Sequence, residues 1–153
     1  AKTDRGTINL NTNGSLPQEV KRMIGSGLDS IRISVNSLNS QYYERYYRPR
    51  GYSFKDVERS VGLSLEKGIF VALNLFFLPG FTDSIEEIDK LYSFLKKYPV
   101  DMIQTRNLNI DPDWYLDSIG FKDSNCTGIR NLIKKLKKDF PKMTLGYYNP
   151  SLR

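Results

Sequence analysis

The chain has 153 residues, a net charge of +6 at neutral pH, a single cysteine and no histidine. This length suits one domain with a real core but falls short of the roughly 250 residues of a complete β/α barrel. The composition excludes an intrachain disulfide and every histidine-dependent site, and because no apolar run approaches the ~18 residues of a membrane span, we expect a cytoplasmic protein that contacts no membrane.

The first predicted unit is a strand at 7–11, a polar turn at 12–14 and a helix that Pro17 opens. Proline tolerates the first helical position because its missing N–H would be unpaired there anyway. The same order of strand, turn and helix returns three more times along the chain. Such repetition predicts right-handed crossovers and a parallel sheet.

The second predicted strand, 29–35, alternates apolar and polar residues, as a half-buried strand does. The connection after it, 36–52, is rich in tyrosine, and its first part, 40–47, is predicted to form a short helix. We expect these tyrosines to pack against the core as amphipathic aromatic side chains. The alternative is that they line a ligand pocket.

The third unit has the clearest helix and strand signals. Ser53 and Asp56 form a variant of the capping box at the start of a helix. The strand that follows, 69–78, is almost continuously apolar, and only Asn74 interrupts it. That pattern is typical of a strand covered on both faces.

The fourth unit begins with a turn at 79–80, and we expect Thr82, Asp83 and Glu86 to cap its helix. The buried side of this helix is predicted to consist of Ile85, Ile88, Leu91, Tyr92 and Leu95. The fourth strand is predicted at 102–108.

A loop, 109–125, and a basic amphipathic helix, 127–140, complete the chain, and 143–148 forms either a last strand or a tail packed on the sheet. The predicted fold is therefore α/β, with four consecutive β/α units that form half of a partial TIM-type barrel with a parallel sheet. We expect a single domain, with the barrel units in 1–110 and the basic helix and tail in 111–153.

Functional groups of parallel β/α proteins gather at the carboxyl ends of the strands. In this chain those ends are rich in amides, hydroxyls and arginine and nearly free of acids. Such groups bind a polar small molecule but do not readily move protons at neutral pH, and arginine suits a carboxylate or a phosphate. The residues concerned are Asn11, Thr12, Asn13, Ser34, Asn36, Pro79, Gly80, Arg106, Asn107 and Asn109.

Three motifs, taken in order, resemble the second half of radical S-adenosylmethionine (SAM) enzymes over about residues 7–110. They are the Thr-Asn-Gly turn at 12–14, an IRxSxxS/D-type strand at 31–37 and the Pro-Gly-Phe-Thr-Asp turn at 79–83. The last turn is similar to that of pyruvate formate-lyase activating enzymes and related Fe–S oxidoreductases. The resemblance implies a partial barrel that carries a [4Fe–4S] cluster and cleaves SAM reductively to a 5′-deoxyadenosyl radical.

The resemblance also implies roles for individual residues. Thr12 and Asn13 would lie near the methionine end of SAM. Ser34 and Asn36 would face its carboxylate or ribose.

Two further roles follow from the resemblance. An arginine of the connection after the second strand, Arg48 or Arg50, would pair with the carboxylate of SAM. Gln104, Arg106 and Asn107 on the last strand would face the substrate, whose identity stays open.

The chain departs from the family pattern in its metal ligands. The family's CxxxCxxC loop and glycine-rich segment are absent, and Cys126 alone cannot supply the three thiolates that the cluster needs. We therefore expect no metal ligands, no catalytic residue and no bound cofactor in this chain, which would be an inert fragment of a longer enzyme that uses SAM and [4Fe–4S]. We also expect self-association through the exposed edge of the first strand, or capping of that edge by 143–148.

Two other classes of function stay open. A non-catalytic half-barrel domain would bind a polar ligand or partner through the same strand ends. A nucleic-acid-binding module would use the basic last helix, with the tyrosine-rich connection as a stacking surface. We rank nucleic acid last because these two segments lie far apart in the sequence.

Overall fold

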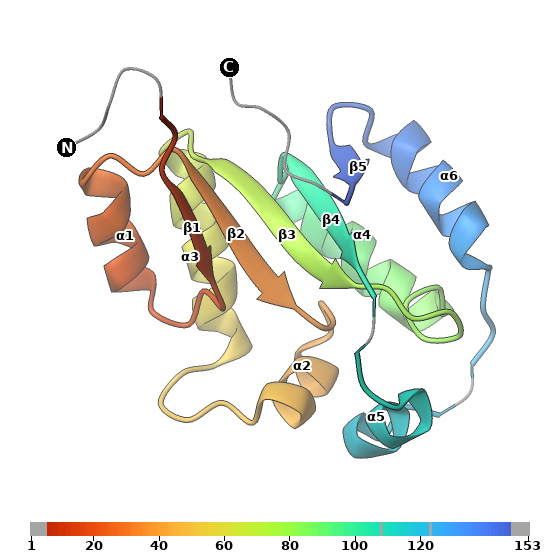
Figure 1. The fold of residues 1–153 in the computed structure, drawn as a ribbon. Helices are drawn as coiled ribbons and strands as arrows, with labels where there is room; N and C mark the ends of the chain where they lie inside the picture. Colours follow the sequence, from red (N-terminus) through yellow and green to blue (C-terminus); the bar gives the residue numbers. More distant parts are fainter. Residues whose placement is uncertain (1–5, 108, 123, 148–153) are drawn as a thin grey trace.

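The computed structural model describes residues 6–107, 109–122 and 124–147 (Figure 1). Its centre is a five-stranded parallel sheet in the order β1-β2-β3-β4-β5. The strands are β1 (Asn9–Thr12), β2 (Ser30–Val35), β3 (Phe70–Phe76), β4 (Met102–Arg106) and β5 (Thr144–Gly146). The predicted α/β class and parallel sheet are confirmed, and the last strand that the sequence left open is β5.

The helices connect the strands and lie on one side of the sheet or beyond its carboxyl edge. They are α1 (Pro17–Gly25), α2 (Ser40–Tyr47), α3 (Phe54–Glu66), α4 (Ile85–Lys97), α5 (Pro112–Ile119) and α6 (Ile129–Asp139). Figure 1 shows α3 and α4 behind the sheet, and α2 and α5 below the arrowheads of the strands. No helix in the described part of the chain is long and apolar enough to span a membrane.

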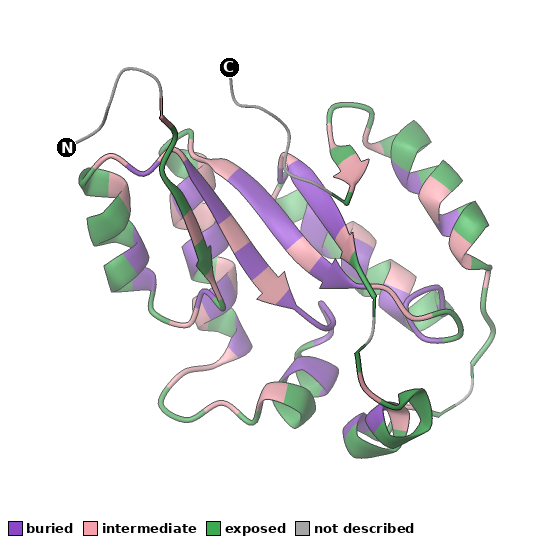
Figure 2. Ribbon diagram, viewed as in Figure 1, coloured by how far each residue is buried: buried purple, intermediate pink, exposed green. Residues whose placement is uncertain are grey.

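The main core lies between the sheet and the helices behind it. Ile31 and Ile33 of β2, Leu73 of β3 and Ile103 of β4 are fully buried there, because alternate residues of a strand point to one face. Figure 2 shows this alternation as purple and pink bands along β2, whereas β3 is mostly purple.

The opposite face of the sheet, which we call the inner face, holds most of the polar side chains of the strands together with the apolar Phe70, Ala72, Phe76 and Met102. It carries Asn9, Asn11, Ser30, Arg32, Ser34, Asn74, Gln104 and Arg106. Figure 1 shows no helix over this face. The third strand is nevertheless buried on both faces over most of its length, as expected, because Ala72 and Phe76 on the inner face are 2% and 6% exposed. The single asparagine of that strand lies on the uncovered side.

A second, smaller core lies at the carboxyl edge of the sheet. It consists of Tyr42, Phe76, Phe81, Tyr115 and Ile119, which join α2, α5 and the end of β3. The expectation of a loop throughout 109–125 is wrong, because α5 forms within it. The side chain of Asp111 accepts a hydrogen bond from the backbone N–H of Trp114, and Pro112 occupies the first turn, which are ordinary start signals of a helix.

The start of α4 also differs from expectation. The cap is Ser84, whose hydroxyl accepts a hydrogen bond from the backbone N–H three residues on, and not Thr82, Asp83 or Glu86. The preceding turn uses the side chains of Thr82 and Asp83 for its own backbone bonds. Ile85, which was expected in the buried face, is 50% exposed because it occupies the first helical position on the outer side.

The two edges of the sheet are β1 and β5. Among the described residues β1 pairs only with β2, and β5 pairs with β4 at the opposite edge. Capping of the first strand by the segment 143–148 is therefore wrong, and Tyr148 itself lies outside the described residues. The outer edge of β1 has no partner strand within this part of the chain.

Candidate functional site

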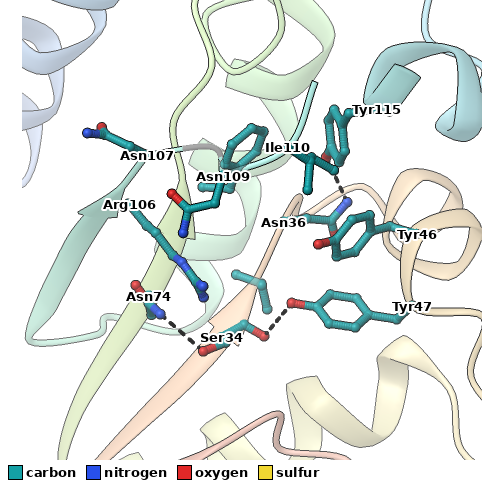
Figure 3. A pocket seen from close by; sticks show the side chains of 12 residues that line it. Ser34, Asn36, Tyr46, Tyr47, Asn74, Arg106, Asn107, Asn109, Ile110 and Tyr115 are labelled. Carbon is teal, nitrogen blue, oxygen red and sulfur yellow. Dashed lines mark hydrogen bonds between the residues drawn. The ribbon is translucent and has the colours of Figure 1, made fainter. Parts of the chain in front are cut away.

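A pocket of about 190 Å³ opens where β2, β3 and β4 end, and we call it the strand-end pocket (Figure 3). The sheet contributes polar groups, and α2 and α5 contribute aromatic rings. Its wall consists of Ser34, Val35, Asn36, Asn74, Phe76, Arg106, Asn107, Asn109, Ile110, Tyr46, Tyr47 and Tyr115. The structure thus brings together five of the strand-end residues that were predicted from the sequence to bind a ligand, Ser34, Asn36, Arg106, Asn107 and Asn109.

The register of the sheet sets the floor of the pocket. Ser34 and Asn74 are paired across β2 and β3, and the amide of Asn74 donates a hydrogen bond to the hydroxyl oxygen of Ser34 at 3.1 Å. The hydroxyl of Tyr47 lies 3.4 Å from the backbone carbonyl oxygen of Ser34. Burial raises the pKa of Tyr47 to about 12 although the charge of Arg106 lowers it, so this hydroxyl stays protonated at neutral pH.

Asn36 is the most deeply buried amide of the pocket wall, with 4% of its surface exposed. Its Nδ2 donates to the hydroxyl of Tyr115 at 3.0 Å and to the backbone carbonyl of Tyr42 at 3.3 Å. Its Oδ1 has no hydrogen-bond partner among the described residues. A buried polar atom without a partner costs about 1–3 kcal/mol, which an O–H or N–H of a bound molecule would offset.

A buried carboxyl group lies behind Asn36. The hydroxyl of Ser37 contacts both carboxylate oxygens of Glu87, at 2.8 and 2.7 Å. Burial raises the pKa of Glu87 to about 7, while the hydrogen bond from Ser37 and the charge of Lys90 lower it. This pair joins the end of β2 to the first turn of α4, and sequence reasoning had not singled it out.

A second hollow lies on the inner face, farther from the carboxyl ends of the strands, and we call it the inner-face cavity. It has a volume of about 320 Å³, and its lining consists of Arg32, Asn74, Gln104, Thr105, Arg106 and Tyr147. Asn74 and Arg106 line both hollows, so the two adjoin. Gln104, predicted to face the substrate, lies in the inner-face cavity and not in the strand-end pocket.

The remaining predicted residues lie outside both hollows. The hydroxyl of Thr12 accepts a hydrogen bond from the backbone N–H of Gly14, and Oδ1 of Asn13 accepts one from the N–H of Ser15, each at 3.1 Å. Arg48 is exposed at the end of α2, with φ of 47°. Their roles toward a ligand stay predictions.

Sequence reasoning missed several residues of the two hollows, notably Arg32, Asn74 and Tyr115. Arg32 stands two positions before Ser34 and thus on the same strand face, which is a signal that the sequence does contain. Asn74 was visible as the one polar residue of an apolar strand. Tyr115 lies in a segment that was expected to be a loop.

The described residues include no group of three or more His, Cys, Asp or Glu side chains that could hold a metal ion. Cys126 is exposed, and its thiol lies 3.2 Å from the carbonyl oxygens of Gly80 and Ser124. These residues do not fit a [4Fe–4S] cluster, which needs at least three protein thiolates.

Comparison with known proteins decides the family. Residues 2–95, more than half of the chain, match the model of the Radical SAM superfamily. This chain belongs to that superfamily. SAM and a [4Fe–4S] cluster are the cofactors that membership in this superfamily implies.

Two curated relatives are described as probable GTP 3′,8-cyclases. The protein of Methanosarcina mazei is 29% identical over 110 residues, and that of Methanosarcina acetivorans is 29% identical over 109 residues. Each alignment covers 69% of the radical SAM chain and 32% of the relative, so the chain spans about a third of their length. The narrower resemblance to pyruvate formate-lyase activating enzymes stays a prediction.

Solved structures show the same fold. HydG, a maturase of the [FeFe]-hydrogenase, superposes with a TM-score of 0.60 at 16% identity, over 95% of the radical SAM chain and 34% of HydG. A radical SAM methyltransferase from Sphaerobacter thermophilus superposes with a TM-score of 0.52 at 14% identity, over 90% of this chain and 39% of the methyltransferase. These likenesses confirm the predicted partial-barrel architecture.

Proposed function

We propose that this chain forms one side of the SAM and substrate site of a radical SAM enzyme whose whole protein cleaves SAM reductively. The observation that carries the proposal is the convergence of Ser34, Asn36 and Arg106 in one pocket at the strand ends. The buried and unpartnered Oδ1 of Asn36 supports it most directly, because a ligand donor would satisfy that atom.

The pocket offers groups that hold and orient a polar ligand. The Oδ1 of Asn36 accepts from a hydroxyl or an ammonium group, and Arg106 donates to a carboxylate. Burial raises the pKa of both tyrosyl hydroxyls, Tyr47 and Tyr115, so neither ionises at neutral pH. The chain's role in this pocket is therefore binding and not proton transfer.

The size of the pocket limits what it holds. Its volume of about 190 Å³ lies below the ≈ 300–1,000 Å³ of typical small-molecule sites. We infer that it takes one end of SAM, and that Gln104, Arg106 and Asn107 serve the substrate side. In the family, cluster-bound SAM supplies the 5′-deoxyadenosyl radical. The residues of this chain do not fit the cluster, so we expect the isolated chain to be inert.

The alternatives are weaker. A non-catalytic domain that binds a polar ligand would use the same pocket, and the superfamily match favours SAM as that ligand. The nucleic-acid alternative needs several tyrosine rings exposed for stacking, but of the five in the connection only Tyr46 is exposed, at 41%, whereas Tyr42 and Tyr43 are 8% and 0% exposed. Tyr42 and Tyr43 pack in the two cores instead.

Calorimetric titration of the chain with SAM tests the proposal. The sequence alone led us to expect no bound cofactor in this chain, but the pocket and the unpartnered Oδ1 of Asn36 lead us to expect saturable binding of SAM. Ser34→Ala should weaken it about fivefold, since one hydrogen bond contributes roughly 1 kcal/mol. Ser26→Ala is the matched control, because Ser26 is exposed at the end of α1 and bonds only within its own turn. Equal loss in both variants, or no saturable binding by the wild-type chain, contradicts the proposal.

A further inference from the structure

We propose that Arg32 and Arg106 form a binding site for an oxyanion group of the substrate, a carboxylate or a phosphate, in the inner-face cavity. The inference rests on the proposed function, because it assigns the adjoining strand-end pocket to SAM. It narrows the substrate, which the family leaves open, to a molecule that carries such an anionic group.

The two arginines come from different strands and reach one hollow. Arg32 is paired with Ala72 and Arg106 with Phe76, which stand two positions before and two positions after Asn74 on β3. The two arginines therefore lie on either side of Asn74 along the direction of the strands. Both line the inner-face cavity. Figure 3 shows Arg106 extending over the sheet toward Asn74 and Ser34.

Neither positive charge is neutralised in the described part of the chain. The ion pairs recorded there are Arg22 with Glu19 and Lys97 with Glu58, and neither involves the two cavity arginines. The other residues of the cavity lining are uncharged. Two like charges that face one hollow repel each other, and a bound anion would replace that repulsion by attraction.

Arg32 is held in place for this role. Its Nη1 donates to Oε1 of Gln104 at 3.0 Å, and Nε2 of Gln104 donates to the backbone carbonyl of Tyr147. Gln104 is 8% exposed, so its amide is fixed from both ends and acts as a positioning residue. A guanidinium has five N–H donors in a rigid fork that matches carboxylate and phosphate oxygens, and only one of them is used by Gln104.

The position of the cavity fits a substrate. Asn74 and Arg106 line both hollows, so a molecule in the inner-face cavity would lie directly against one in the strand-end pocket. Arg32 lines only the inner-face cavity. A substitution of Arg32 therefore distinguishes binding in the inner-face cavity from binding in the strand-end pocket, whereas a substitution of Arg106 would affect both.

The test is an NMR titration of the whole chain that follows the arginine Nε–Hε signals at constant ionic strength. The probes are inorganic phosphate, glutarate and methionine, which represent a phosphate substrate, a carboxylate substrate and the carboxylate end of SAM. We expect phosphate or glutarate to shift the signals of Arg32 and Arg106 saturably. Arg32→Gln should weaken this binding at least tenfold.

Arg22→Gln is the matched control, because it removes the same charge from the exposed face of α1. It should leave the affinity for the anions unchanged. Arg32→Gln should also leave binding of SAM within twofold of the wild-type value, since Arg32 does not line the strand-end pocket. Loss of SAM binding by the wild-type chain with anion binding intact would overturn the proposed function and not the arginine site.

Three results overturn the arginine site. In the first, neither phosphate nor glutarate gives a saturable shift at the two arginines. In the second, Arg22→Gln weakens binding as much as Arg32→Gln does, which would show general attraction to a basic protein. In the third, methionine alone shifts both signals, which would make the pair part of the cofactor site.

Discussion

Gly14 occupies a backbone conformation that other residues rarely adopt, with φ of +70°. A Cβ at this position would lie 3.2 Å from Cγ2 of Ile33 and 3.4 Å from Cγ1 of Val57, in the main core. Its carbonyl also accepts a hydrogen bond from Ser60 of α3 at 2.7 Å. The Thr-Asn-Gly turn is thus anchored both by its conformation and by packing.

We expect Gly14→Ala to lower the free energy of unfolding by at least about 1–2 kcal/mol, the cost of a left-handed conformation for an L-residue. Urea denaturation measures the change. Gly25→Ala is the control, since Gly25 ends α1 with a negative φ and a Cβ there meets nothing within 4 Å. Equal stability of Gly14→Ala and wild type would contradict this view of the turn.

Glu87 predicts a pH dependence of stability. Its pKa is raised from 4.5 to about 7 in the folded chain, so folding favours its protonated form. The stability that this provides is complete at pH values below the unfolded pKa and is lost as the pH rises toward 7, on the order of 3 kcal/mol in total. Glu87→Gln keeps a neutral side chain and should abolish this loss.

Thermal unfolding between pH 4 and pH 8 measures the effect as a difference between variants. Glu87→Gln should match the wild type near pH 4 and exceed its stability near pH 8. Glu19→Gln, which removes an exposed carboxylate, should follow the wild-type curve. A constant difference between Glu87→Gln and wild type across the range would show that Glu87 does not titrate as expected.

Part of the candidate site could be predicted one residue at a time. Ser34, Asn36 and Arg106 follow from the rule that polar side chains at strand ends converge. Arg32 and Gln104 lie deeper on the inner face, and their meeting depends on the length and path of the Arg32 side chain across β3. A rule about strand ends does not contain that information.

At the scale of elements, α5 depends on a contact from α2. Arg45 donates a hydrogen bond to the carbonyl of Ile119 at 2.7 Å, and its guanidinium lies where a Cβ on Gly120 would be. This contact ties down the end of the helix that presents Tyr115 to the strand-end pocket. Because Arg45 is partly open to solvent, the bond is worth about 1 kcal/mol.

We expect Arg45→Ala to speed amide hydrogen exchange in α5 about fivefold while exchange in β2 and β3 stays unchanged. Exchange measured by mass spectrometry over peptides from 112–119 checks this. Arg22→Ala is the control, because its ion pair with Glu19 on the surface of α1 adds little stability. Faster exchange across the whole chain would mean that Arg45 supports the global fold instead.

The elements that periodicity predicted well are those with long and regular patterns. Strands β2, β3 and β4 and the helices α1, α3, α4 and α6 all bury an apolar face. Helix α5 was not predicted because it spans 8 residues and buries only Tyr115 and Ile119. Its apolar residues therefore do not recur often enough to show a helical period. Its start signals at Asp111 and Pro112 were the better guide.

At the scale of the whole molecule, the outer edge of β1 offers unpaired backbone groups. The carbonyl of Ile8 bonds to the backbone of β2, so by alternation the N–H groups of Asn9 and Asn11 face outward. Such an edge favours pairing with another chain. We expect concentration-dependent dimerisation in sedimentation experiments.

Asn11→Pro tests whether the edge is the contact, because it removes an outward N–H and spares the bonds to β2. This variant should dimerise more weakly than the wild type, provided that its circular dichroism spectrum matches. Gln18→Pro places the same residue in α1 near its start and should leave association unchanged. Dimerisation that persists unaltered in Asn11→Pro would place the contact elsewhere.

The central claim is that the strand-end pocket binds SAM, and an NMR titration of backbone amides with SAM tests it most directly. We expect saturable shifts at residues 34–36, 74, 76, 106, 107, 109, 110 and 115, with α6 unaffected. Saturable shifts confined to α6, or no saturable shift at the strand ends, would contradict the claim and leave the pocket without its proposed ligand.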